Sequence, residues 1–167
     1  DCLLLTSLQS LASVIDLSQK RTTKFFQIGV SIEENKNIQL RTFHEAQKEV
    51  LQILNIYHKP QSNRTSKTLW EQAILKAVQR GIIFKVLYPL HMILPQRILQ
   101  LQKRYPQQFF IRYLDTSFVR CDIIDHDKVL IKLVHEDPLS FGGVFFIEHE
   151  KLNQNLRTLF YELWEKA

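Results

Sequence analysis

The chain has 167 residues, of which 45% are hydrophobic and 23% charged, and its formal net charge is +5. This composition fits one soluble globular domain that is long enough to bury a core. No apolar run approaches the roughly 20 residues needed to span a bilayer. The amino terminus, Asp1-Cys-Leu-Leu-Leu, lacks the basic region and the cleavage site of a signal peptide.

Cysteine use and charge indicate the compartment and the partners. Cys2 and Cys121 are the two cysteines, and their separation favours a reducing, cytoplasmic setting over a disulfide framework. The basic excess permits a polyanion partner, but Lys and Arg are spread along the chain, as on an ordinary solvated surface. The chain does not start with Met, so we expect a fragment, and we expect DNA to be contacted only through a module preceding Asp1.

The first 22 residues are expected to form an amphipathic helix that links or dimerises the domain. Its apolar positions follow heptad-type spacing: Leu4, Leu8, Leu11 and Ile15. An ordinary amphipathic helix packed on its own domain is the alternative, since fewer than three heptads do not decide between them.

Residues 23–167 are expected to form one α/β domain, a mixed β-sheet flanked by helices. Strands are predicted at 25–31, in the second half of 50–57, and at 82–88, 109–114, 118–124, 129–134 and 143–147. Helices are predicted after the capping box Ser31-Ile-Glu-Glu34, with Ile38, Phe43, Ala46 and Val50 buried, and at 68–80, 95–105 and 150–166. Gly81 should end the second of these helices, and 125–128 should form a hairpin turn.

Ligands of such sheets gather beyond the carboxyl ends of the strands, here at His58, Lys59 and Tyr88. Strand alternation places Phe118, Arg120, Asp122 and Ile124 on one face. Arg120 among apolar neighbours would be costly unless it met a carboxylate or a ligand anion. The alternative is an edge-strand arginine exposed to water.

The segment from Phe118 to Asp125 resembles the phospholipase D signature His-x-Lys-x4-Asp in its spacing. Phe118 stands in the histidine position, and a phenyl ring can neither attack phosphorus nor carry a proton. Arg120 keeps the positive charge of the lysine position, and Asp125 keeps the carboxylate. The resemblance therefore implies a frame that binds without catalysis.

Two other segments resemble phospholipase D-like domains. Arg80-Gly81-Ile-Ile-Phe-Lys-Val-Leu is similar to their Arg-Gly-Val step, and the ending 160–167 is similar to the close of their degenerate members. Those members include the effector-binding part of TrmB-like transcriptional regulators, in which a coiled-coil helix joins a winged helix to this fold.

The resemblance implies a homodimeric, non-catalytic domain that binds a small, anionic or sugar-like effector. The expected ligand-binding residues are Phe118, Arg120, Asp125, His58, Lys59 and Tyr88. No cofactor or metal is expected, because His126, Asp127, His135, Glu136 and Asp137 lack a unifying ligand spacing. The alternatives are a phosphodiesterase or nuclease that uses His58 or His126, and a protein–protein assembly module.

Overall fold

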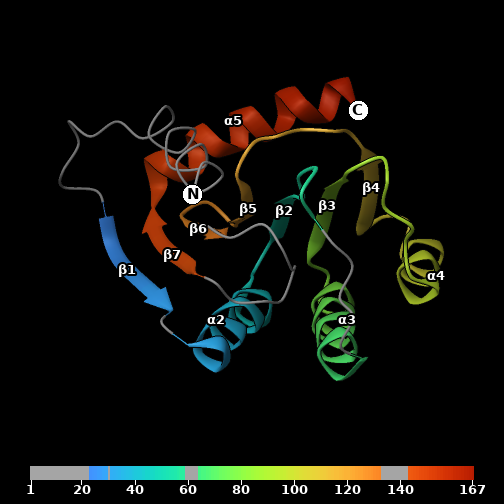
Figure 1. Cartoon of the computed structure of the whole chain (residues 1–167), viewed down its shortest axis with the longest axis horizontal. Helices are drawn as coiled ribbons and strands as arrows, with labels where there is room; N and C mark the ends of the chain where they lie inside the picture. The colour runs from blue at the N-terminus through green and yellow to red at the C-terminus, as the bar shows by residue number, and fades with distance from the viewer. Residues whose placement is uncertain (1–22, 30, 59–63, 133–142) are drawn as a thin grey trace.

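A computed structural model describes residues 23–29, 31–58, 64–132 and 143–167 (Figure 1). Its centre is a seven-stranded mixed sheet with the order β1-β7-β6-β5-β2-β3-β4. The strands are β1 (Thr23–Gly29), β2 (Glu49–Ile53), β3 (Ile83–Tyr88), β4 (Phe109–Tyr113), β5 (Arg120–Ile124), β6 (Lys128–Lys132) and β7 (Val144–His149). β2, β3 and β4 run parallel, and every other pair is antiparallel. The expected α/β class with a mixed sheet is confirmed.

The helices divide between the two faces of the sheet. α2 (Ile32–Glu45), α3 (Arg64–Gln79) and α4 (Gln96–Arg104) lie on one face, and α5 (Glu150–Lys166) lies on the other (Figure 1). The amino end of α2 is capped as expected, since the Ser31 hydroxyl accepts a hydrogen bond from Glu34 N at 3.2 Å. Gly81, with φ +89°, follows α3 in a left-handed conformation that glycine adopts without strain.

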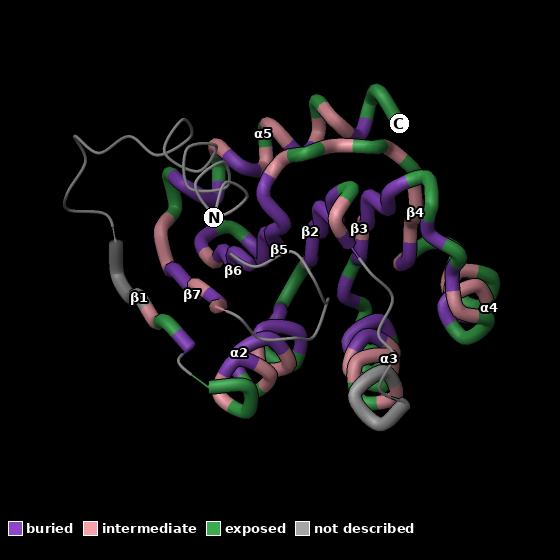
Figure 2. The backbone as a smooth tube through the Cα atoms, in the orientation of Figure 1, coloured by how far each residue is buried: buried purple, intermediate pink, exposed green. Residues whose placement is uncertain are grey.

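Each face of the sheet carries its own hydrophobic cluster, so the inner strands are buried along most of their length (Figure 2). Phe43, Phe84 and Phe109 belong to the cluster under α2, α3 and α4. Leu51, Ile123 and Phe160 belong to the cluster under α5. The side chains of a strand alternate between these two clusters, which fixes the face to which each polar residue is directed.

The region between α2 and β2 differs from the prediction. Val50 was expected on the buried side of a helix, but the strand occupies Glu49–Ile53 and Val50 is a strand residue. α2 ends at Glu45, and Asp125 accepts hydrogen bonds from the backbone that enters β2. Tertiary pairing with β3 and β5 therefore decides the conformation of this segment, overriding its local pattern.

The amino end of β5 also differs, because this strand begins at Arg120 and Phe118 lies before it. The expected hairpin turn is present between β5 and β6, with Asp125 at φ +53°. Residues 1–22, including the heptad positions Leu4, Leu8, Leu11 and Ile15, lie outside the described residues. Within the described part, no helix combines the length and apolarity that crossing a membrane would require.

Candidate functional site

Polar side chains from three strands meet at the edge of the sheet where β2 and β3 end. β5 runs antiparallel to β2, and β6 antiparallel to β5, so the first residue of β5 and the last residue of β6 lie at this same edge. Arg120 is directly opposite Lys132 in the ladder, and Asp122 is opposite Gln52. Directly opposed residues project to the same face, which here is the face covered by α2 and α3.

The charges at this edge are buried. Lys132 is 2% exposed, Arg120 is 7% exposed, and Asp122 is 3% exposed. Two positive charges placed directly opposite each other on neighbouring strands destabilise a sheet, and burial increases the effect. Buried charges with perturbed environments concentrate at functional sites, which makes this pair a candidate for binding an anion.

Asp122 is the carboxylate nearest to this pair in the ladder. Burial raises its pKa to about 6, although Arg120, a hydrogen bond from Gln52 and the charge of Lys132 act in the opposite direction. The Gln52 amide donates to this carboxylate at 3.1 Å. Part of the Asp122 carboxyl group is therefore protonated at slightly acid pH.

His58 lies within the electrostatic field of the same cations. Burial lowers its pKa to about 2, and Arg120, Lys132 and His91 add to this effect. The imidazole is thus neutral, and within the described part of the chain its Nδ1 atom has no hydrogen-bond partner. The loop that carries it is fixed by His58 N donating to Asn55 O and by a 3.0 Å contact between His91 Nε2 and His58 O.

Tyr88 contributes a buried hydroxyl from the end of β3. Burial raises the pKa of Tyr88 well above its usual range, with Arg120 acting against the shift and with Tyr113 and Glu71 adding to it. Its ring lies 6.4 Å from the ring of Tyr113. We call the six residues at this edge the cationic cluster: Gln52, His58, Tyr88, Arg120, Asp122 and Lys132.

Phe118 lies next to this edge but packs elsewhere. Asn55 Nδ2 donates to Phe118 O at 3.0 Å, and Ile56 N donates to Thr116 O at 2.9 Å, so the loop after β2 is joined to the segment before β5. The Phe118 side chain is partly buried and packs against the hydrophobic cluster under α5. The backbone of Phe118 thus supports the edge, while its ring belongs to the α5 side.

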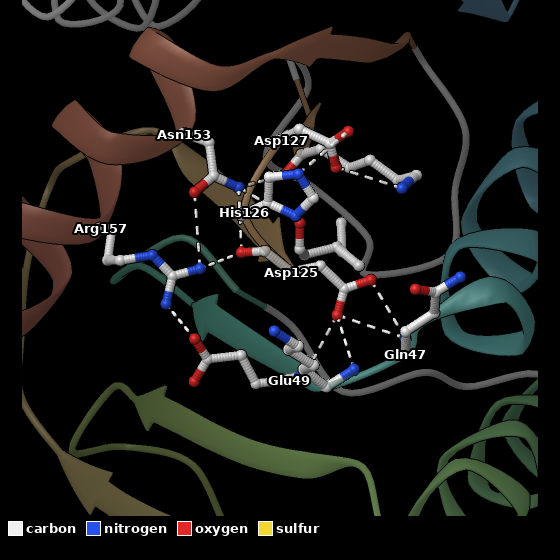
Figure 3. Close-up of polar contacts among 10 residues, drawn as sticks. Gln47, Glu49, Asp125, His126, Asp127, Asn153 and Arg157 are labelled. Carbon is white, nitrogen blue, oxygen red and sulfur yellow. Dashed lines mark hydrogen bonds and ion pairs between the residues drawn. The ribbon is translucent and has the colours of Figure 1, made fainter.

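Asp125 lies at the other end of β5, where it anchors the structure (Figure 3). Its carboxylate accepts hydrogen bonds from Gln47 N at 3.0 Å, Lys48 N at 2.8 Å and Glu49 N at 3.2 Å. Arg157 donates to Asp125 O and to Glu49, and Asn153 donates to Lys128 O at 2.9 Å. These bonds join the β5–β6 turn to β2 and α5.

The structure thus brings together three of the predicted ligand residues, Arg120, His58 and Tyr88, and places Asp125 apart from them. Lys59 lies outside the described residues. The sequence reasoning passed over Lys132, Gln52 and Asp122 as ligand residues. A signal for Lys132 was present, because it follows the apolar run 129–131 and shares the alternation of Leu130.

The cationic cluster is not a metal site in the described part of the chain, where no His, Cys, Asp and Glu residues form a group suited to a metal ion. His126, one of the residues weighed for metal binding, is exposed in the β5–β6 turn. Surface pockets occur elsewhere, for example a pocket of about 420 Å³ between α3 and α4. The cationic cluster differs from that pocket because its charged side chains are buried.

Comparison with solved structures places the fold. The archaeal chromatin protein TrmBL2, whose structure shows a novel mode of DNA binding, matches with a TM-score of 0.62 and 22% identity. The match covers 96% of this chain and 58% of TrmBL2, so the chain spans little more than half of that protein.

Two further matches cover nearly all of the compared protein. NucT from Helicobacter pylori matches with a TM-score of 0.65 and 12% identity, over 84% of this chain and 97% of NucT. The phospholipase D family member Nuc from Salmonella typhimurium matches with a TM-score of 0.63 and 12% identity, over 84% of this chain and 94% of Nuc.

No family model and no curated protein matches the sequence. Identities this low establish a shared fold and leave activity open. The shared fold agrees with the resemblance in the sequence. The chain therefore has the fold of phospholipase D-like domains.

Proposed function

We propose that this chain is a non-catalytic effector-binding domain of a regulator, and that its cationic cluster binds a small anion such as a sugar phosphate. The observation that carries the proposal is the buried, directly opposed pair of Arg120 and Lys132 at the edge where the parallel strands end. Open α/β sheets bind ligands at this edge. An anion there would lower the repulsion between the two cations.

The neutral members of the cluster suggest a ligand with hydroxyl groups. Tyr88 supplies a phenol group, Gln52 an amide, and His58 a neutral imidazole whose Nδ1 is without a partner among the described residues. Hydroxyl groups can both donate and accept, so they suit a site of this mixed character. These neighbours favour a sugar-like anion over an inorganic one.

The proposal of no catalysis rests on the position of Phe118 in the resemblance to the phospholipase D signature. The alternative is a phosphodiesterase in which His58, the imidazole of the cationic cluster, takes the catalytic role of the missing histidine. Hydrolysis of bis-p-nitrophenyl phosphate decides between these functions. We expect no turnover, whereas turnover that is abolished by His58→Gln would indicate a phosphodiesterase.

The regulator function requires a dimer and a route to DNA. We propose that residues 1–22 pair two chains through Leu4, Leu8, Leu11 and Ile15, and that a separate module binds operator DNA. The fold shared with TrmBL2 supports this assignment. Removing residues 1–20 should halve the mass measured in solution, and an unchanged mass would count against pairing through this segment.

Thermal denaturation in the presence of anionic metabolites tests effector binding. A ligand at about 100 times its Kd stabilises the folded state by about 2.7 kcal/mol, which raises Tm by several degrees in a domain of this size. We expect a sugar phosphate to raise the Tm of the unaltered chain. The shift should disappear in Arg120→Gln and persist in Lys151→Gln, which alters an exposed residue of α5. An equal shift in both variants would refute the proposed site.

A further inference from the structure

Lys and Arg are spread evenly along the chain, but the acidic residues are not. Residues 50–114 contain ten Lys or Arg residues and one acidic residue, Glu71. This stretch contains α3, β3, α4, β4 and all of β2 except its first residue, Glu49. Because β2, β3 and β4 are neighbours in the sheet, the basic residues of this stretch lie on adjoining strands and on the helices α3 and α4 beside them (Figure 1).

Part of this charge lies on the outer side of the two helices that cover β2, β3 and β4. Most of the exposed side chains there are polar or basic, although Leu69 of α3 is 40% exposed. We call seven of the polar and basic residues the α3–α4 face: Gln72, Lys76, Gln79, Arg97, Gln100, Lys103 and Arg104. Arg97 and Arg104 are two turns apart on the same side of α4, roughly 10 Å along the helix axis. Both line the pocket of about 420 Å³ between the helices, together with Gln72 and Gln100.

The one carboxylate in this region does little to neutralise the face. The side chain of Glu71 is 10% exposed and lies at the base of the pocket, 3.4 Å from Arg97 Nη1. The Arg97 side chain is 64% exposed, so water screens this ion pair. The other cations of the face, Lys76, Lys103 and Arg104, are exposed as well.

The chemistry of the face fits the backbone of a nucleic-acid duplex better than it fits other polyanions. A membrane-binding helix needs several large apolar residues on its outer side. Ile98 and Leu101 of α4 are buried against the domain, and Leu69 is the large apolar side chain that α3 exposes among the described residues. A single strand is held by exposed aromatic rings on which bases stack. Tyr105 lines the pocket, but its ring is half-buried and lies beside the Arg104 guanidinium. Lys, Arg and Gln side chains are typical phosphate contacts.

We propose that the α3–α4 face binds the sugar–phosphate backbone of duplex nucleic acid, without reading the base sequence. This site is separate from the cationic cluster and does not depend on an effector. We expect three phosphate contacts, from Arg97, Arg104 and one lysine. A plot of the logarithm of the binding constant against the logarithm of the salt concentration should then have a slope of about −3.

The test is a fluorescence-anisotropy titration of the chain with a labelled duplex DNA of mixed sequence, at about 50 to 200 mM salt. We expect Arg97→Gln combined with Arg104→Gln to weaken binding by one to two orders of magnitude at the lowest salt, and to reduce the slope by about two. The matched control is Lys151→Gln combined with Lys166→Gln, which removes the same charge from exposed positions of α5. The control should lose much less affinity, and both double variants should keep the Tm of the unaltered chain.

Additional arms separate the possible partners and the two proposed sites. Duplex RNA that binds as well as duplex DNA would agree with recognition of the backbone. Tighter binding of single strands, binding of anionic lipid vesicles in place of duplex, or equal losses in the two double variants would overturn the proposal. Arg120→Gln should leave duplex binding unchanged, so failure of the effector site and failure of this face give different results.

Discussion

Arg120 and Lys132 show how single residues can mark a site in a sheet whose remaining interior is mostly apolar. Both lie on the face that also carries Leu130 and Ile124, where hydrophobic side chains would pack more favourably. Asp122 and Gln52 complete a polar layer across three neighbouring strands. A buried polar layer of this kind is costly in stability, which agrees with the anion site proposed for this edge.

The pH dependence of stability should reveal the neutral state of His58. The unfolded chain takes up a proton at this residue below about pH 6.5, whereas the folded chain does so only near pH 2, so acid favours unfolding. Asp122 acts oppositely, because its folded pKa of about 6 lies above its ordinary value of 3.8 and its protonation therefore favours the folded state as the pH falls from 6. The two contributions partly cancel in the unaltered chain.

The difference between the unaltered chain and His58→Gln isolates the histidine. Below pH 6.5, the free energy of unfolding of the unaltered chain should fall relative to that of the variant by up to about 1.4 kcal/mol for each pH unit. Urea denaturation between pH 5 and pH 7.5 measures this difference. A constant difference across that range would mean that His58 titrates alike in both states.

At the scale of elements, Asp125 organises the end of the sheet opposite the cationic cluster. One carboxylate accepts hydrogen bonds from three consecutive backbone N–H groups at the entry to β2, and the same residue makes the left-handed turn between β5 and β6. Arg157 and Asn153 connect this turn to α5 (Figure 3). Three separate segments of the chain therefore depend on Asp125.

We expect Asp125→Ala to lower the free energy of unfolding by roughly 2–4 kcal/mol, because it leaves three partly buried N–H groups without their shared acceptor. Asp127→Ala in the same turn should cost less than about 1 kcal/mol, since its side-chain partners among the described residues are the partly exposed Lys128 and the exposed His126. Urea denaturation of both variants provides the comparison. Equal losses would show that Asp125 is not the anchor.

The cap of α2 offers a second prediction at this scale. Ser31→Ala removes the acceptor for Glu34 N and should lower the free energy of unfolding by about 1 kcal/mol. Ser31→Thr keeps an acceptor at this position, so it should be closer to the unaltered chain. A shift in the urea midpoint at an unchanged slope reports the effect, and no difference between the two variants would contradict it.

Most elements could be predicted because their signals are local. Ser31 marks the start of a helix because its side chain caps the backbone, and Gly81 marks the end of one because it adopts a positive φ. Asp125 suits a turn because aspartate also tolerates a positive φ. The start of β2 could not be predicted in this way, since pairing with β3 and β5 decides it. The prediction for Phe118 was also wrong, because it applied strand alternation to a residue that lies before the start of β5. The Phe118 ring packs on the α5 side of the sheet.

At the scale of the whole molecule, the sequence indicated the edge at which the cationic cluster lies but only some of its residues. His58 and Tyr88 were predicted as ligand-binding residues from the carboxyl ends of β2 and β3, and Arg120 was predicted from the phospholipase D-like spacing. Lys132 joins them only because β6 pairs antiparallel with β5, and this pairing is a property of the assembled sheet. The grouping of the basic residues of 50–114 could not be predicted from the sequence alone, because β2, β3 and β4 become neighbours only in the folded sheet.

The most direct measurement of anion binding at the cationic cluster is a ¹⁵N NMR titration with a sugar phosphate at constant salt concentration. We expect the side-chain resonances of Arg120 and His58 to move together and to saturate, while those of Arg157 near Asp125 stay in place. Saturable shifts that omit Arg120, or no shifts at either residue, would contradict the account.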